Sequence, residues 1–175
     1  MHTKVKYTIF QTKWGFFGLA ATDAGLCRTC LPCLDKEKVK AALLKGLSDA
    51  EHQKDLLKPL QQLIKSYYKG AYVNFDNSVP VDLAGLTPFA RTVLKACCRI
   101  KPGRTLTYRQ LAQSARRPKA ARAAGSVMAK NPLPLIIPCH RIIRSDGHIG
   151  NFSVPGGSVV KKKMLEHERH VVYSR

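Results

Sequence analysis

Residues 136–143 are Ile136-Ile137-Pro138-Cys139-His140-Arg141-Ile142-Ile143, so a cysteine, a histidine and an arginine stand side by side between two apolar runs. A cysteine among β-branched residues is ordinarily a buried, inert thiol. A cysteine beside an imidazole and a guanidinium can instead form a thiolate near neutral pH, and the thiolate is the nucleophile. Both interpretations fit this segment, so the flanking sequence has to separate them.

The composition is that of a globular protein. A chain of 175 residues, 45% of them apolar, can bury a core as one domain or as two small ones. The sequence contains no apolar run of the roughly 18–20 residues that span a bilayer. Its first residues lack the apolar stretch of a signal peptide, so we expect the six scattered cysteines to be reduced thiols in a cytosolic protein.

Positive charge is concentrated in the second half of the chain. Residues 1–84 hold 12 Lys and Arg against 8 Asp and Glu, a net charge of +4. Residues 85–175 hold 18 Lys and Arg against 3 Asp and Glu, a net charge of +15. A solvated surface does not require this asymmetry, so it indicates a polyanionic partner, and nucleic acid fits better than a membrane.

The first half has the pattern of a small α/β domain with an antiparallel sheet and helices. Turn signals at Gly15 and Gly25 separate short apolar runs, and helical periodicity follows them. Pro59 lies within the second helical pattern and marks either its start or a kink. The expected strands are 5–10, 16–21, 26–31 and 71–75, and the expected helices are 36–47 and 53–68.

The second half, after a linker expected at 77–86, has a mostly helical pattern. Thr87 and Thr107 are suitable helix caps, and Pro118 can open a third helix that runs to about residue 130. Three short helices with tight turns in a basic segment are typical of a helix-turn-helix, although small helical bundles share this pattern. We therefore predict an α+β protein with domains 1–84 and 85–175, the second of them winged-helix-like.

The third of these helices is unusually bare. Residues 120–126 are Ala-Ala-Arg-Ala-Ala-Gly-Ser, so Arg122 is the one long side chain among small ones. Small residues allow a close approach to another surface, which is either a second helix or a DNA groove. In the groove, Arg122 would insert into the base stack and displace a base.

Taken together, these motifs resemble the O6-alkylguanine-DNA alkyltransferases, also called methylated-DNA–protein-cysteine methyltransferases. The resemblance covers roughly residues 85–170, and the first half matches that family only in outline. The matching pieces, in order, are Thr107-Tyr108-Arg109-Gln110-Leu111-Ala112, Ala121-Arg122-Ala123, Asn131-Pro132, Pro134, Ile137-Pro138-Cys139-His140-Arg141, Gly150-Asn151 and His167-Glu168.

The resemblance implies a role for each matching residue. Cys139 would accept the alkyl group, His140 would remove its proton through a water, and Glu168 would orient the imidazole. Tyr108 would donate a proton to the departing guanine, unless it merely packs. The implied DNA-binding residues are Arg122, Ala121, Ala123, Gly125, Ser126 and Arg141, and the implied pocket residues are Asn131, Pro134, Ile142 and Ser153.

Two points stay open at this level. The segment around Pro155 is about two residues longer than the family's commonest pattern, which leaves both Glu166 and Glu168 as candidate acidic partners; aligning the following residues favours Glu168. In the first half, Cys27, Cys30 and Cys33 have a spacing that suggests zinc. On a strand, residues three apart point to opposite faces, so free thiols are our default and we expect no metal.

The resulting hypothesis is a DNA-repair transferase. It would flip a damaged base out of double-stranded DNA and move the alkyl group from O6-alkylguanine, and from O4-alkylthymine, to Cys139 in one irreversible turnover. We expect no cofactor, a monomer, and a place in the cytoplasm, or in the nucleus of a eukaryote. The alternatives are a non-catalytic lesion-binding module and a Cys-His hydrolase. The depressed pKa expected of the Cys139 thiol is part of the hypothesis.

Overall fold

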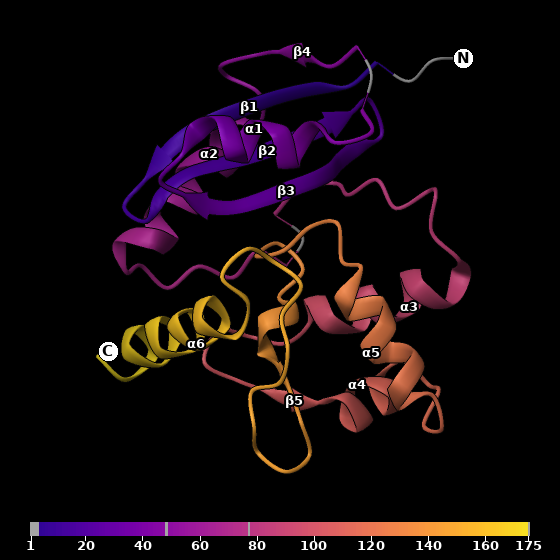
Figure 1. Ribbon diagram of the computed structural model, residues 1–175. Coiled ribbons are helices and arrows are strands. Elements are labelled where there is room, and N and C mark those ends of the chain that lie inside the picture. The colour runs from indigo at the N-terminus through magenta and orange to yellow at the C-terminus, as the bar shows by residue number, and fades with distance from the viewer. Residues whose placement is uncertain (1–3, 48, 77, 175) are drawn as a thin grey trace. The chain divides into compact units, whose positions relative to one another are not determined.

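The computed structural model describes residues 4–47, 49–76 and 78–174 and divides the chain into two compact units. One unit comprises Met1–Val73 with Asn77–Ala84, and the other comprises Asn74–Asp76 with Gly85–Arg175. The architecture is α+β, with an antiparallel-sheet unit followed by a mostly helical one (Figure 1).

The first unit is built on a four-stranded sheet of order β3-β2-β1-β4. Strands β1, β2 and β3 form an antiparallel meander, and the short β4 pairs parallel with β1. Gly15 has a φ of 122°, which a residue with a side chain rarely adopts, and it closes the first turn. The elements are β1 (Lys6–Thr12), β2 (Gly15–Thr22), β3 (Gly25–Cys33), α1 (Lys36–Leu44), β4 (Glu51–His52) and α2 (Lys58–Lys69).

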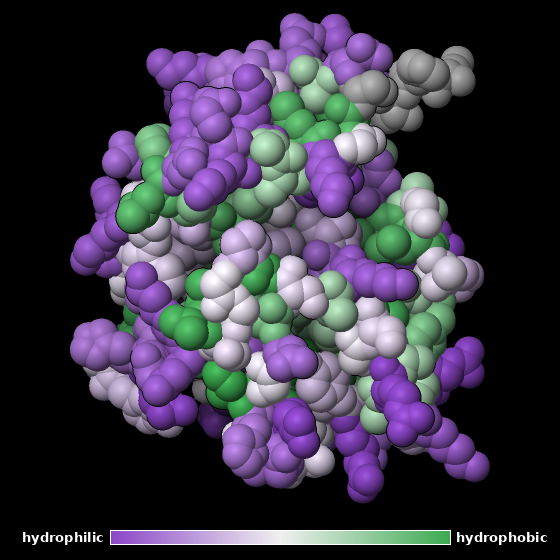
Figure 2. Space-filling view, in the orientation of Figure 1, coloured by the Kyte–Doolittle hydropathy of each residue, from purple (hydrophilic) through white to green (hydrophobic). Residues whose placement is uncertain are grey.

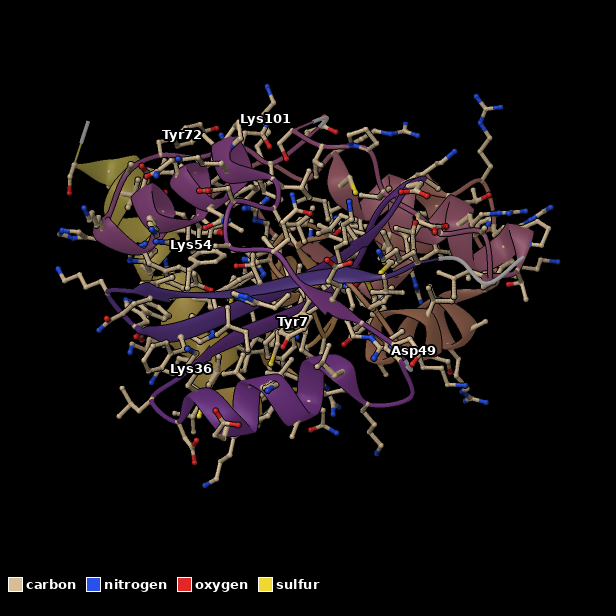
Figure 3. The ribbon with its side chains drawn as sticks, turned by 90° about the horizontal axis from the view of Figure 1, so that it is seen from above. Tyr7, Lys36, Asp49, Lys54, Tyr72 and Lys101 are labelled. Atoms are coloured by element: carbon tan, nitrogen blue, oxygen red, sulfur yellow. The ribbon has the colours of Figure 1, made fainter. Side chains whose placement is uncertain are left out.

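The side chains of β1 alternate between the two faces of this sheet, and one helix packs against each face. Tyr7 packs in a cluster with Leu43 of α1, and Figure 3 shows Tyr7 between the sheet and this helix, which begins at Lys36. Phe10 points the opposite way and contacts Phe17, whose ring in turn lies 6.2 Å from that of Tyr68 on α2. The two-residue period of a strand therefore places core on both faces.

Three expected elements of this unit differ in the structure. Helix α2 begins at Lys58 and not at residue 53, because Leu57 adopts a left-handed conformation and Pro59 occupies the first turn. Residues 71–75 do not form the expected strand. The expected linker is partly attached to the sheet, since Leu26 forms an isolated bridge with Val81; its first residue, Asn77, lies outside the described residues.

The three cysteines of β3 are free thiols. Cys27 and Cys30 pack against the same core cluster, so the expectation that they point to opposite faces is wrong. The register of the β2–β3 pairing shifts between Ala20 and Ala21, and such an irregularity interrupts strict alternation. Within the described ranges, no group of three or more His, Cys, Asp or Glu side chains is arranged to hold a metal ion.

In the second unit, α4 packs against both α3 and α5, in a helix-turn-helix arrangement. Thr107 caps α4 in a reciprocal capping box with Gln110, and Thr87 caps α3, as the sequence predicts. No helix in the described part of the chain is long and apolar enough to cross a membrane. The elements are α3 (Pro88–Cys98), β5 (Leu106–Thr107), α4 (Tyr108–Ser114), α5 (Ala121–Ala129), the 3-10 turn η1 (Cys139–Arg141), β6 (Ile142–Ile143) and α6 (Gly157–Tyr173).

Candidate active site

The turn η1 (Cys139–Arg141) carries the three residues that define the site. All three are buried, with exposed fractions of 6%, 0% and 2% for Cys139, His140 and Arg141. A 3-10 turn has three residues per turn, so three consecutive side chains leave it in three directions. Cys139 faces a cavity, while His140 and Arg141 reach Glu168 on α6, which packs against η1.

Glu168 is the hub of a buried ionic network. One of its oxygens, Oε1, lies 2.8 Å from His140 Nε2 and accepts a 2.8 Å hydrogen bond from Arg141 Nη2. The other, Oε2, accepts hydrogen bonds from Arg141 Nε at 2.9 Å and from the backbone N–H of Gly103 at 3.2 Å. Arg141 also donates to the carbonyl of Ile100. The carboxylate is thus satisfied on both oxygens, as a buried charge requires.

The electrostatics favour a neutral cysteine and a neutral histidine. Burial raises the pKa of the Cys139 thiol, although the Asn131 amide and the charge of Lys161 oppose this. Burial likewise lowers the pKa of His140, outweighing the opposing effect of Glu168. The depressed pKa expected for Cys139 is therefore wrong for the free protein, because desolvation outweighs the nearby cations.

Glu168 remains ionised in this network. Burial would raise the pKa of its carboxyl group, but the charges and hydrogen bonds of His140 and Arg141 outweigh it and hold the pKa well below the usual value. With His140 neutral, the hydrogen bonds of both side chains and the permanent charge of Arg141 still favour the ionised carboxylate.

Asn131 holds the sulfur from the side of the preceding loop. Its amide Nδ2 donates to Cys139 Sγ at 3.0 Å and to the carbonyl of Ile137 at 2.8 Å, while its Oδ1 accepts from the N–H of Leu133 at 3.0 Å. One amide therefore fixes both the loop and the orientation of the thiol.

Cys139 opens onto a cavity of about 830 Å³. Tyr108 of α4 is half-buried on its wall, and burial raises the pKa of the phenol, so it stays protonated and able to donate. The lining residues are Tyr108, Ala121, Arg122, Gly125, Ser126, Met128, Ala129, Cys139, Arg144, Ser145, Gly150, Asn151, Phe152 and Ser153.

The structure brings together most of the residues expected at the site, with three corrections. Arg141 was expected to bind DNA, but its guanidinium is buried against Glu168 and has no surface to offer. Pro134 and Ile142 were expected to line the pocket, but both are buried and neither is among the lining residues. Asn131 is also absent from the lining, and it acts on the sulfur instead.

Burial and contact with His140 distinguish the two candidate acidic partners. Glu168 is 1% exposed and touches His140, whereas Glu166 is exposed and forms a 3.9 Å pair with Lys162. On a helix, positions two apart face different directions, so only one of the two can reach η1.

Helix α5 presents the bare surface that its sequence suggests. Arg122, Ala123 and Ser126 are exposed, and Ala121 and Gly125 are partly exposed. A Cβ built on Gly125 would lie 3.6 Å from the Tyr108 ring, so small residues bring this helix close to the cavity wall. Figure 2 shows hydrophilic side chains projecting at the lower right, over the loop between α4 and α5.

Sequence reasoning missed several residues of the site. Lys161 is 1% exposed, and its buried position on α6 is indicated by its spacing from Met164, Glu168 and Val171, since the four recur at helical intervals on one face. Arg144 and Phe152 line the cavity from irregular segments, for which the sequence has no periodic signal.

The chain is similar to known proteins over most of its length. Residues 88–170 match the family model described as "6-O-methylguanine DNA methyltransferase, DNA binding domain". A methylated-DNA–protein-cysteine methyltransferase of Cricetulus griseus is 35% identical over 94% of this chain and 82% of its own length. That of Methanosarcina barkeri is 32% identical over 94% of this chain and 97% of its own length.

The chain belongs to the methylated-DNA–protein-cysteine methyltransferase family. The chain matches a smaller part of other members. It spans 61% of the length of the Methanothermobacter thermautotrophicus protein, at 43% identity. It spans 38% of the length of the Rattus norvegicus protein, at 54% identity.

Solved structures match nearly the whole chain. The Mycobacterium tuberculosis OGT in complex with DNA is 26% identical with a TM-score of 0.78, and the match covers 95% of this chain and 94% of that one. The O6-methylguanine methyltransferase from Mycobacterium tuberculosis has a TM-score of 0.76 at the same identity, with 94% and 93% coverage.

Proposed function

We propose that this protein repairs double-stranded DNA by transferring the alkyl group of O6-alkylguanine, and of O4-alkylthymine, to Cys139, once per molecule. Family membership supports this proposal, as do the relatives named methylated-DNA–protein-cysteine methyltransferase and the DNA complex of the similar Mycobacterium tuberculosis structure. The protein would act as a monomer without a cofactor, in the cytoplasm or in the nucleus of a eukaryote.

The observation that carries the proposal is the position of the sulfur. Cys139 Sγ is at a cavity wall, with an amide donor at 3.0 Å, and the next residue of its turn, His140, is paired with Glu168 on α6. A nucleophile, a base and a group that orients the base are the parts that nucleophilic displacement needs.

The reaction balances within these groups. His140 takes the thiol proton, by way of one water, and the sulfur attacks the alkyl carbon in line with the C–O6 bond. The S–C bond forms, the C–O6 bond breaks, and its electron pair stays on guanine, which takes up one proton with Tyr108 as the donor. His140⁺ then returns a proton to the Tyr108 phenolate by way of solvent, which restores both side chains to their neutral forms.

A neutral thiol at rest is compatible with this chemistry. Nδ1 of His140 is buried and has no hydrogen-bond partner among the described groups, so it is available to accept a proton. Because Glu168 is ionised, it stabilises the imidazolium once it forms. The thiolate is then needed only while the alkyl group is in reach, and the cost of forming it is part of the reaction barrier.

The bare face of α5 supports base flipping as the route into the cavity. A guanine inside a duplex cannot reach Cys139, so its nucleotide must leave the stack. Arg122 is exposed on α5 and also lines the cavity, which suits a side chain that fills the gap left by the base.

Intact-mass spectrometry after mixing with O6-methylguanine DNA tests the proposal. We expect a gain of one methyl group, located on Cys139 by peptide mapping, and product formation that stops at one equivalent. Cys139→Ser is the control, which should gain nothing while still binding DNA, because an alkoxide is far harder to form than a thiolate.

The same experiment separates the two rivals. Product accumulating well beyond one equivalent would indicate a hydrolase that turns over. Tight binding of the lesion without any mass gain would indicate a lesion-binding module. Methyl groups found on Cys27 or Cys98 would mean that the acceptor has been misassigned.

A further inference from the structure

We propose that Arg144 is a positioning residue for the proton transfer to guanine: its positive charge stabilises the Tyr108 phenolate that forms when the phenol gives its proton to the leaving base. The inference rests on the proposed function and adds to it a residue to which the reaction scheme above assigns no part.

The first observation is that Arg144 and Tyr108 border the same space. Both line the cavity onto which Cys139 opens, Tyr108 from α4 and Arg144 from the loop that follows β6. A Cβ built on Gly150 would lie 3.3 Å from Cγ of Arg144 and 3.8 Å from the hydroxyl oxygen of Tyr108. The stem of the arginine and the hydroxyl of the phenol therefore flank one point of the cavity wall.

The second observation is the sign of the charges around the phenol. In the described part of the chain, the cavity is lined by two cations, Arg122 and Arg144, and by no carboxylate. Burial raises the pKa of Tyr108, negative charge on Cys139 adds to this, and Arg144 is the neighbour that opposes both. A nearby cation favours the phenolate, so Arg144 has the charge that the departing proton requires.

The third observation is how the guanidinium of Arg144 is held. Its Nε donates to Asp146 Oδ2 at 3.1 Å, and its Nη2 lies 3.0 Å from the same oxygen. Asp146 also accepts from the backbone N–H of His148 at 3.1 Å and lies 3.2 Å from the ring Nδ1 of that residue. The side chains of Arg144 and Asp146 are 62% and 45% exposed, so solvent weakens their pairing. Asp146 therefore orients the guanidinium without cancelling its charge at the cavity.

The proton transfer balances with Arg144 as a bystander. The O–H bond of Tyr108 breaks, the proton goes to guanine, and the electron pair stays on the phenolate oxygen. No bond to Arg144 forms, and the guanidinium keeps its charge because it is not deprotonated in proteins. A base that fills the cavity displaces water, which strengthens the attraction between the guanidinium and the phenolate.

A second explanation is that Arg144 binds a phosphate of the flipped nucleotide, for which a guanidinium is also suited. Both explanations predict slower repair of duplex DNA when Arg144 is replaced. Free O6-benzylguanine separates them, because it has no phosphate. Only the first explanation predicts a slower reaction with the free base, and only the first requires the hydroxyl of Tyr108.

The experiment measures the rate of mass gain on Cys139 with free O6-benzylguanine in the unaltered protein, Arg144→Met, Tyr108→Phe and the double variant. Arg144→Met keeps an apolar side chain and removes the charge, and Arg144→Lys keeps the charge. The matched control is Arg109→Met, which removes one positive charge from the exposed position next to Tyr108, outside the cavity lining.

We expect Arg144→Met to slow the reaction by roughly tenfold when Tyr108 is present and by less than about twofold in the Tyr108→Phe protein. Arg144→Lys and Arg109→Met should stay within about twofold of the unaltered protein. Equal losses with and without the phenol hydroxyl would overturn the proposal. A loss on duplex DNA alone would overturn it in favour of phosphate binding.

A titration of Tyr108 tests the charge directly and would not respond to a merely structural role. The protein is labelled with 3-fluorotyrosine, and the Tyr108 signal in ¹⁹F NMR is the one missing from Tyr108→Phe. In Arg144→Met this signal should titrate at a higher pH, by roughly a few tenths of a unit because the empty cavity is open to solvent. Arg109→Met should leave the midpoint in place. Equal midpoints in Arg144→Met and the unaltered protein would refute the coupling.

Failure of the proposed function would look different. The mass gain of the unaltered protein on O6-methylguanine DNA reports on alkyl transfer, whereas the NMR titration reports only on the phenol. A shifted Tyr108 midpoint in Arg144→Met without any transfer by the unaltered protein would leave the Arg144–Tyr108 coupling standing and remove its proposed purpose.

Discussion

Cys139 combines a nucleophilic sulfur with surroundings that keep it protonated. Burial raises the pKa of the thiol and lowers the pKa of His140, so both groups favour their neutral forms and the proton stays on the sulfur. A neutral thiol reacts slowly with oxidants and stray electrophiles, since susceptibility follows thiolate character. For the single-turnover acceptor that we propose, such protection would preserve the thiol until substrate is bound.

Replacing Glu168 by Gln should affect both stability and transfer. It leaves the buried Arg141 without its counter-charge, which typically costs about 3–5 kcal/mol, and it weakens stabilisation of the His140 imidazolium. We expect a lower urea midpoint and at least roughly tenfold slower transfer. Glu166→Gln is the matched control and should change stability by less than about 0.5 kcal/mol, because Glu166 is exposed. The reverse order of effects would show that Glu166 is the functional partner.

The pKa of His140 predicts an acid-sensitive fold. Its pKa is lowered in the folded protein, so the unfolded chain binds a proton first as the pH falls. Its contribution to stability is therefore complete above the unfolded value of about 6.5 and is lost as the pH falls below it. Urea midpoints measured from pH 8 to pH 5 should decrease, and the decrease should be smaller in His140→Gln. Parallel curves for the two proteins would contradict the direction of this shift.

At the scale of elements, the turn between α3 and β5 is a structural support for the network. Its Gly103 has a φ of 76°, donates its N–H to Glu168, and would place a Cβ 2.8 Å from Val172 Cγ2. The turn, η1 and α6 therefore meet at one carboxylate.

Gly103→Ala should destabilise the protein more than Gly147→Ala does. Both replacements place a side chain at a positive φ, which costs roughly 1 kcal/mol, but nothing lies within 4 Å of a Cβ at Gly147. The difference between their urea midpoints measures the contact with Val172. Equal losses of stability in the two variants would mean that α6 moves to accommodate the new Cβ without loss of stability.

Helix α5 should matter for duplex DNA and not for a free base. We expect Arg122→Ala to slow repair of O6-methylguanine in a duplex by at least roughly tenfold, because it removes the side chain that we propose to fill the gap left by the flipped base. Reaction with free O6-benzylguanine, which needs no flipping, should stay within about twofold and is the internal control. Equal losses on both substrates would place Arg122 in the chemistry or in folding.

At the scale of the whole molecule, the charge asymmetry predicts salt-sensitive binding. Residues 85–175 carry 18 Lys and Arg against 3 Asp and Glu. Among the described residues of this segment, Arg141 and Lys161 are buried and therefore unavailable to phosphates. Affinity for unmodified duplex DNA should fall by roughly tenfold or more between about 50 and 200 mM salt. Fluorescence anisotropy measures this, and an affinity independent of salt would exclude phosphate contacts as its main source.

The sequence by itself determined the elements that local chemistry controls. Thr87 and Thr107 each cap the helix that follows them, because a threonine hydroxyl accepts from the first free N–H groups. Pro59 has no N–H to donate, so it lies in the first turn of α2. Glycines form the turns between the strands. It also placed Cys139 and His140 next to each other, because adjacency in the chain needs no folding.

Only the tertiary structure decided what lies around them. Whether Arg141 faces DNA or Glu168, whether Lys161 is solvated or buried, and whether the thiol is ionised all depend on how α6 packs against η1. Arg141 and Glu168, which join the two elements, are 27 residues apart in sequence. Burial of these groups arises from contacts between distant segments, and desolvation outweighs the neighbouring charges that the sequence displays. The sequence therefore identified the nucleophile, and its protonation state followed from the packing.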